Sequence, residues 1–317
     1  MKTLSLIVLL ISSVVSQSLN AQDNMVFVNG GSYKMGDFTG EGYKDARPLH
    51  DVVLDPFYIS KYQLTVGEFG DFVKESGYIT DCEKKGGGKV FLIENGVQTF
   101  EHDSLACWRY VGYVPNDNQP VTFVSWIDAI NYCNWKSEKE SLACCYKIIG
   151  DSVVWDKSAK GYRLLTEAEW EFVARSGGKN YKFVWGNDSL PMINGRNAAN
   201  IKDETYKNAM PPDAKLKPIW EGYNDGYLYT APVGSFAPNE LGVYDMCGNV
   251  YEWCWDWYGS YSEEPVNNPD GSATGEARVC RDVGYACPIG QIGTTHRGAS
   301  KPGNCLDNVG FRIGRSK

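Results

Sequence analysis

The stretch Gly161-Tyr-Arg-Leu-Leu-Thr-Glu-Ala-Glu-Trp-Glu-Phe172 places the start of a helix directly after a short apolar run. Thr166, followed three residues later by Glu169, forms a capping box, in which the side chain of each residue accepts a hydrogen bond from the backbone N–H of the other. Trp170 and Val173 then lie on one helical face. The segment therefore predicts a short capped helix whose apolar face packs into a core.

Two further helices are predicted from capping residues elsewhere in the chain. Thr65 with Glu68 forms another capping box, and Gly77 is placed to end that helix. Ser125 can cap a third helix, in which Trp126 and later apolar residues share one side. We interpret the apolar positions of these helices as core residues and not as a cofactor site.

Strands and irregular segments surround the predicted helices. Residues 90–100 alternate around Asn95-Gly96, a dipeptide that favours a two-residue hairpin turn, and residues 52–59 alternate as one further strand. From about Ser176 onward Gly, Asn, Asp and Pro interrupt every few residues, while Trp and Tyr stay frequent. Such a stretch indicates packed irregular structure. We therefore predict a single loop-rich α+β domain.

The beginning of the chain predicts export. Lys2 precedes an almost unbroken apolar run, Leu4–Val15, and small or polar residues follow as far as Ala21. This is the pattern of a secretory signal peptide, so we expect residues 1–21 to be removed and residues 22–317 to form the domain. The run is shorter than the ~20 apolar residues of a membrane span. We expect a periplasmic or extracellular protein with no membrane span.

Charge and histidine content disfavour several classes of function. The formal net charge of −8 disfavours nucleic-acid binding, which needs a basic surface. The three histidines, His50, His102 and His296, lie far apart in the sequence. A zinc cluster of His and Cys is therefore not expected, and a Ser-His-Asp triad has few candidates.

The ten cysteines of an exported chain allow disulfide bonds, but their spacing does not fix the pairs. Cys82 and Cys107 flank the predicted hairpin and could bridge. Cys287 could pair with Cys280 or Cys305, or remain a buried thiol.

Two loop segments carry oxygen donors suited to a hard cation. In Asp245-Met-Cys-Gly-Asn-Val-Tyr-Glu252, two carboxylates flank a turn that contains glycine. In Asn224-Asp225-Gly226-Tyr227, a turn offers another carboxylate, with Asn200 as a possible partner. Calcium accepts this kind of flexible oxygen coordination, although an Asp-Gly pair is more often only a turn.

Five spaced motifs resemble the sulfatase-modifying-factor (formylglycine-generating enzyme) family. The match covers nearly all of the chain, from about Met25 to Ser316. Leu165 stands where the family usually has proline. The motifs are Gly31–Gly36, Gln119–Cys133, Gly161–Phe172, Ala231–Phe236 together with Gly242–Trp253, and Gly310–Arg312.

This resemblance implies a compact fold related to C-type lectins, and it implies structural calcium. Carried over by motif, two sets of ligands follow. The first set is Asn200, Ile201 (carbonyl), Asp225 and Tyr227 (carbonyl). The second set is Asp245, Gly248 (carbonyl), Val250 (carbonyl) and Glu252.

The family's enzymes oxidise a cysteine of a sulfatase segment to formylglycine, with oxygen and a copper ion held by two thiolates. Soft monovalent copper suits two thiolates, so both are required. Cys287 stands at the place of the first thiolate, but Ile292 stands where the second is expected. Asp282, Val283 and Gly284 also replace the glycine pair and serine that precede the first cysteine in the enzymes.

Two hypotheses follow. In the first, the chain is a calcium-stabilised scaffold without oxidase activity that binds a protein, a peptide or a glycan. In the second, it is a formylglycine-generating oxidase whose rearranged copper site uses Cys287 and another thiolate. Aromatic and basic residues could form a binding groove, and the candidates are Trp255, Trp257, Tyr258, Tyr285, His296 and Arg297.

Overall fold

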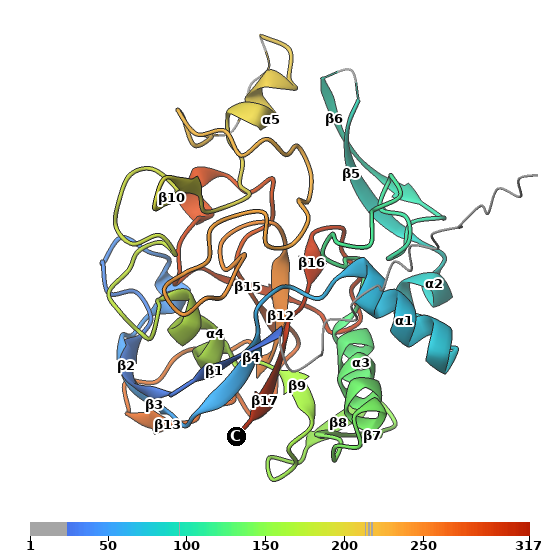
Figure 1. Ribbon diagram of the computed structural model, residues 1–317, viewed down its shortest axis with the longest axis vertical. Helices are drawn as coiled ribbons and strands as arrows, with labels where there is room; N and C mark the ends of the chain where they lie inside the picture. Colours follow the sequence, from blue (N-terminus) through green and yellow to red (C-terminus); the bar gives the residue numbers. More distant parts are fainter. Residues whose placement is uncertain (1–23, 95, 213, 215, 217) are drawn as a thin grey trace, which may run out of the picture.

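The computed structural model describes residues 24–94, 96–212, 214, 216 and 218–317 (Figure 1). The predicted signal peptide, residues 1–21, lies outside the described residues. The α-helices are α1 (Val66–Ser76), α2 (Asp81–Lys85), α3 (Trp126–Lys139), α4 (Glu167–Ala174) and α5 (Glu204–Asn208), and the short 3-10 helices are η2 (Lys44–Ala46) and η3 (Ile289–Gln291). The strands of the first half are β1 (Met25–Val28), β2 (Gly31–Met35), β3 (His50–Leu54), β4 (Phe57–Ser60), β5 (Gly88–Glu94), β6 (Val97–Asp103), β7 (Tyr146–Ile149) and β8 (Ser152–Trp155). Those of the second half are β9 (Tyr162–Leu164), β10 (Met192–Ile193), β11 (Arg196–Asn197), β12 (Tyr251–Trp257), β13 (Val266–Asn267), β14 (Arg278–Arg281), β15 (Arg297–Ser300), β16 (Val309–Gly310) and β17 (Ile313–Ser316).

The strands form small sheets that join distant parts of the chain. One sheet has the order β1-β4-β17-β9, with every pair antiparallel. A second has the order β15-β14-β12-β16, in which β12 and β16 run parallel. A third has the order β13-β3-β2. Figure 1 shows α1, α2 and α3 on one side of the molecule, with the hairpin β5–β6 beside them and β2, β3 and β13 on the opposite side. The prediction of a single α+β domain is confirmed.

The three predicted helices are present and begin at their predicted caps. Thr65, Ser125 and Thr166 each accept a hydrogen bond from the backbone N–H three residues on, and the capping box is complete in all three. Gly77 ends α1 with a φ of 67°, a conformation that glycine adopts without strain. A fourth capping box, Thr80 with Glu83, begins α2. The Thr-x-x-Glu spacing of α2 was available in the sequence and was missed.

The predicted hairpin is confirmed, and residues 52–59 are extended as predicted but form parts of two strands instead of one. β5 and β6 pair antiparallel on either side of residues 95–96. Residues 52–59 are divided between β3 and β4, which belong to different sheets. Pro56 has no backbone N–H to donate to a ladder, so the pairing stops there and the chain crosses to the other sheet.

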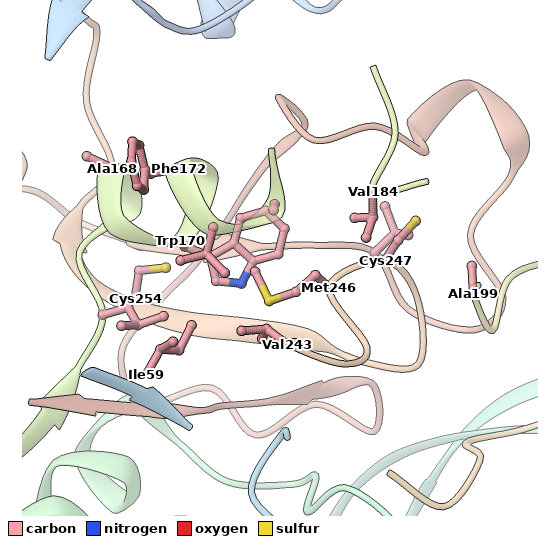
Figure 2. Packing of buried hydrophobic residues seen from close by; sticks show 14 of the residues in the cluster. Ile59, Ala168, Trp170, Phe172, Val184, Ala199, Val243, Met246, Cys247 and Cys254 are labelled. Atoms are coloured by element: carbon pink, nitrogen blue, oxygen red, sulfur yellow. The ribbon is translucent and has the colours of Figure 1, made fainter. Parts of the chain in front are cut away.

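Two buried clusters make up most of the core. One surrounds α4 and includes Trp170, Met246 and Cys287, and the other surrounds α1 and α3 and includes Phe69 and Trp126. Figure 2 shows Trp170 projecting from α4 toward Met246 and Val243. The helix residues expected to form core are therefore core residues. The two clusters meet along β12, whose residues Glu252 to Asp256 are all buried.

No helix in the described part of the chain is long and apolar enough to cross a membrane.

Candidate functional site

Cys287 lies on the loop that follows β14. Its side chain is 9% exposed, and the hydroxyl of Tyr251 lies 3.2 Å from its Sγ. Burial raises the pKa of the Cys287 thiol, although the contact with Tyr251 opposes this shift. Burial of this thiol therefore favours its protonated form.

The turn before Cys287 holds a residue other than glycine in a backbone conformation that favours glycine. Asp282 has a φ of 73°, in the left-handed region that favours glycine. Its Oδ1 accepts hydrogen bonds from the backbone N–H groups of Gly248 and Val283, both at 2.7 Å, while its Oδ2 has no partner. Burial raises the pKa of the Asp282 carboxyl well above its usual range. These bonds hold the turn in the strained conformation.

The position expected for a second thiolate holds an apolar side chain. Ile292, which follows η3, is 6% exposed and lines a cleft. Cys247 and Cys254 share the buried cluster of Cys287, and burial raises the pKa of both thiols well above the usual range. Among the described residues no group of three or more His, Cys, Asp or Glu side chains is arranged to hold a metal. The residue at the expected position of the second thiolate is thus an isoleucine, whose side chain cannot ligate copper.

A large cleft, with a volume of about 910 Å³, lies beside this loop. Four chain segments line it, residues 38–43, 182–189, 219–221 and 289–296. The ion pair of Lys182 with Glu41, at 3.0 Å, joins two of its walls. The aromatic side chains in its wall are Phe38, Tyr43, Phe183 and Trp220.

The loop from Pro288 to His296 is fastened to both sides of the cleft. Ile289 N–H donates to the carbonyl of Pro218, and Thr294 N–H donates to that of Lys182. The Thr294 hydroxyl donates to the carbonyl of Tyr181 at 2.7 Å. The loop that lacks the second cysteine thus forms a fixed wall of the cleft.

The structure does not bring the predicted groove residues together. His296 lines the large cleft, where its ring packs against that of Tyr43 with 5.5 Å between centroids. Trp255 stacks on Tyr146 in the core at 5.1 Å. Tyr285 is also buried, and burial raises its pKa well above the usual range.

Arg297 and Trp257 line a different and smaller cleft of about 250 Å³. Arg297 donates to both carboxylate oxygens of Glu167, at 2.7 and 2.9 Å, so its guanidinium is already paired. The Tyr258 hydroxyl donates to Asp45 at 2.7 Å. Of the aromatic residues that follow the predicted calcium block, Trp255 therefore packs in the core, Tyr258 bonds a carboxylate, and Trp257 lines the small cleft.

The first oxygen cluster comprises the four residues of the first predicted calcium set, Asn200, Ile201, Asp225 and Tyr227. Asp225 accepts hydrogen bonds from the N–H groups of Ile201 at 2.9 Å and Tyr227 at 2.7 Å, so three of the four residues are in direct contact. The side-chain oxygen of Asn200 is buried and has no partner. Among the described residues, the carbonyls of Ile201 and Tyr227 accept no hydrogen bond.

The charge of the first oxygen cluster is uncompensated. Asp225 is 7% exposed and forms no ion pair with any described residue. Burial, and then the neighbouring charge of Asp203, raise the pKa of Asp225 to about 7. Unpartnered oxygens beside a buried carboxyl fit a hard cation such as calcium, which would supply the missing positive charge.

The second oxygen cluster comprises Asp245, Gly248, Val250 and Glu252. Unlike those of the first cluster, its oxygens face side-chain hydrogen-bond donors. Glu252 accepts bonds from Arg312 Nε and Nη2, both at 2.7 Å, and from Trp170 Nε1 at 2.8 Å. Gln63 Nε2 lies 3.0 Å from Glu252 Oε1. The amide of Gln63 also faces three backbone carbonyls of the cluster. The point on which these oxygens converge is therefore occupied by the hydrogens of Gln63 and Arg312, which does not fit a bound cation, although Asp245 Oδ1 stays buried without a partner.

Sequence reasoning missed Gln63. It lies between β4 and α1, nearly two hundred residues from Glu252 in the chain, and no local motif marks it. Its neighbour Leu64 is fixed from both sides, because Leu64 N–H donates to the carbonyl of Phe311 and Leu64 C=O accepts from the N–H of Val121.

The ten cysteines, all within the described residues, form no disulfide bond. Cys82 lies beside Cys305, and the interaction between the two thiols lowers the pKa of Cys82 and raises that of Cys305. The neighbour of Cys82 is therefore a cysteine of the C-terminal loop, which differs from the Cys82–Cys107 pair that the sequence had suggested.

These features define a class of protein, a loop-rich α+β domain with one buried cysteine beside a large cleft. The profile of the sulfatase-modifying factor enzyme 1-like domain matches residues 12–317, so the chain belongs to this family. It is 33% identical over 307 residues to the formylglycine-generating enzyme of Streptomyces coelicolor, with 89% of this chain and 86% of that protein covered.

Other relatives differ in what their names state. The chain is 29% identical over 316 residues to the inactive C-alpha-formylglycine-generating enzyme 2 of Bos taurus, covering 91% of this chain and 87% of that one. Among solved structures, PvdO from Pseudomonas aeruginosa superposes with a TM-score of 0.63 at 28% identity, covering 92% of this chain and 94% of that one.

Proposed function

We propose that this protein is an exported binding protein without cysteine oxidase activity, and that its large cleft holds an extended segment of a partner protein. One observation carries the first part, which is that the place of the second thiolate holds the buried, apolar Ile292. A single thiol cannot supply the two thiolates that monovalent copper needs in this chemistry.

The cleft supports the second part of the proposal. Its volume of about 910 Å³ lies within the range of ligand-binding pockets, and four separate chain segments contribute to its wall. Aromatic rings such as Phe183 and Trp220 offer apolar contact, while Lys182, Glu41 and Gln291 offer polar contact at the same wall. An extended peptide presents both kinds of group in alternation.

Calcium at the first oxygen cluster completes the proposal. Asn200, Ile201, Asp225 and Tyr227 would hold the ion, and its charge would compensate the buried Asp225. We assign this ion a structural role, because these residues lie in the irregular segment between α4 and β12.

The oxidase part is tested with a peptide that carries the Cys-x-Pro-x-Arg sulfatase motif, incubated with the folded protein, copper(I) and oxygen. Mass spectrometry is expected to show no formylglycine. Conversion that disappears in Cys287→Ala would contradict the proposal and favour the oxidase with a rearranged copper site.

The binding part is tested by selecting extended peptides from a display library on the purified protein. Tyr43 is 49% exposed and lines the cleft, so Tyr43→Ala is expected to weaken binding at least about tenfold. Phe100, 54% exposed on the hairpin β5–β6, provides the matched control, and Phe100→Ala is expected to bind as the wild type does. Selection of no peptide, together with binding to a glycan array, would assign the cleft to sugars instead.

A further inference from the structure

We propose that this chain holds a cation at the first oxygen cluster only, and that the side-chain amide of Gln63 takes the place of the cation at the second. The statement about the first cluster rests on the proposed function. The statement about the second cluster stands on its own contacts.

One nitrogen atom faces an oxygen of every residue in the second predicted calcium set. Gln63 Nε2 lies 3.0 Å from Glu252 Oε1, 3.3 Å from the carbonyl oxygens of Asp245 and Val250, and 3.5 Å from that of Gly248. Gln63 itself is 1% exposed. The point on which these oxygens converge is therefore filled by an atom that carries hydrogens.

The orientation of the Gln63 amide is fixed by its other end. Gln63 Oε1 accepts a hydrogen bond from Asn249 Nδ2 at 3.0 Å. Asn249 cannot turn over, because its Oδ1 accepts from Ala231 N–H at 2.9 Å and its Nδ2 donates to Ala231 C=O at 3.2 Å. The Gln63 oxygen thus faces Asn249, and the NH₂ group faces the second cluster.

One of the two carboxylates of the second cluster, that of Glu252, is already paired with an arginine. Arg312 makes two bonds to the carboxylate of Glu252, and its Nη2 also donates to the carbonyl of Asp245 at 3.0 Å. A calcium ion there would meet the hydrogens of an amide and of a guanidinium. In the first cluster no described arginine or lysine forms an ion pair with Asp225.

One oxygen of the second cluster remains unpartnered. The Oδ2 of Asp245 accepts from Gly234 N–H at 2.7 Å, whereas its Oδ1 is buried without a partner. Calcium takes 6–8 oxygen ligands, so this single oxygen does not make a calcium site while the other oxygens of the cluster are bonded to Gln63 and Arg312.

The first experiment counts calcium. The full-length protein, freed of metal with EDTA, reloaded with calcium and dialysed, is analysed by plasma mass spectrometry for calcium per chain. We expect one calcium in the wild type and none in Asp225→Asn, whose fold is checked by circular dichroism. Two calcium ions in the wild type, or one retained in folded Asp225→Asn, would overturn the proposal.

The second experiment converts the second cluster into a cation site. Gln63→Glu exchanges the NH₂ group for a carboxylate oxygen, so we expect it to bind one calcium more than the wild type and to need calcium for full thermal stability. Gln98→Glu, which adds the same charge on the exposed strand β6, is the control and is expected to gain none. A folded Gln63→Glu protein that gains no calcium would also overturn the proposal.

The two statements can fail separately. A wild type without calcium and a Gln63→Glu protein with one would uphold the role of Gln63 and refute the cation at the first cluster. If Gln63→Glu does not fold, the calcium counts of the wild type and Asp225→Asn still decide the matter.

Discussion

The two oxygen clusters are neighbours and have similar oxygen ligands, but they differ in the groups that surround those ligands. Asn200 of the first and Gly248 of the second form a parallel β-bridge, so the clusters lie back to back. Each combines carboxylate and backbone carbonyl oxygens. Each also keeps one buried oxygen without a partner, Asn200 Oδ1 in the first and Asp245 Oδ1 in the second. In the second, Gln63 donates to the convergent oxygens and Arg312 pairs with Glu252, whereas in the first Asp225 has no ion-pair partner among the described residues. The comparison teaches that ligand type alone does not define a cation site, because the donors that surround the ligands decide whether a cation is needed.

The largest expected effect comes from the residue that joins the two clusters. Gly248 has a φ of 89°, and a Cβ there would lie 2.0 Å from the carbonyl oxygen of Asn200. Gly248→Ala is expected to cost at least about 4 kcal/mol in the free energy of unfolding, or to prevent folding, because backbone atoms cannot yield as a side chain does. Urea unfolding measures the change. Gly290→Ala, where a Cβ meets nothing within 4 Å, should be close to neutral.

A smaller loss is expected when the positive charge of the second cluster is removed. Arg312→Met leaves the fully buried Glu252 unpaired and should cost about 3 kcal/mol in the free energy of unfolding. Denaturant unfolding with and without calcium gives the value. The control is Arg109→Met, which breaks an ion pair whose arginine side chain is 54% exposed and should cost less than about 1 kcal/mol. Equal losses in the two variants would contradict the buried pairing as the source of stability.

The effect of calcium on stability should distinguish the two clusters. At a calcium concentration 100 times the dissociation constant, the wild type should be about 2.7 kcal/mol more stable than in EDTA. Thermal unfolding should show this difference in Asp245→Asn, which alters the second cluster, and should show none in Asp225→Asn, which alters the first. The comparison fails if Asp245→Asn loses the calcium response and Asp225→Asn keeps it.

The buried carboxyl of Asp307 lies outside both clusters, so its effect on the pH dependence of stability should not depend on calcium. Burial raises the pKa of Asp307 to about 6, while a hydrogen bond from Phe91 N–H opposes the shift. The folded state therefore holds the proton more tightly than the unfolded state, so the stabilisation is complete below pH ~4 and is lost as the pH rises through about 6.

Asp307→Asn should lack this loss. Between pH 4 and pH 7 the free energy of unfolding of the wild type should fall by about 2 kcal/mol more than that of the variant. The difference should be the same in calcium and in EDTA, because no cation is assigned to Asp307. A calcium-dependent difference would show that the clusters are not the source of the calcium response.

The sequence predicted those features that depend on neighbours in the chain. Capping boxes such as Thr166 with Glu169 located the helix starts, and Asn95-Gly96 located the hairpin. The place of Cys287 and the absence of a second cysteine at Ile292 were also readable, because both follow from spacing along one loop.

Features that depend on distant neighbours were not predictable. Nothing near Gln63 indicates that its amide meets Glu252, since the contact depends on how β4, β12 and the C-terminal strands come together. Trp255 suggested a binding surface, but both faces of β12 are covered, so the ring packs inside. The division of residues 52–59 could have been read from Pro56, and the helix at Thr80 from its spacing to Glu83.

The sheet order β1-β4-β17-β9 has a consequence for the time course of folding. β17, residues Ile313–Ser316, is the last strand of the chain, yet it pairs with β4 on one side and with β9 on the other. During synthesis, the edges of β4 and β9 that face β17 stay unpaired until these four residues have been made. β17 thus completes a sheet whose other strands are synthesised earlier, and because it lies between β4 and β9, its loss would separate these two strands.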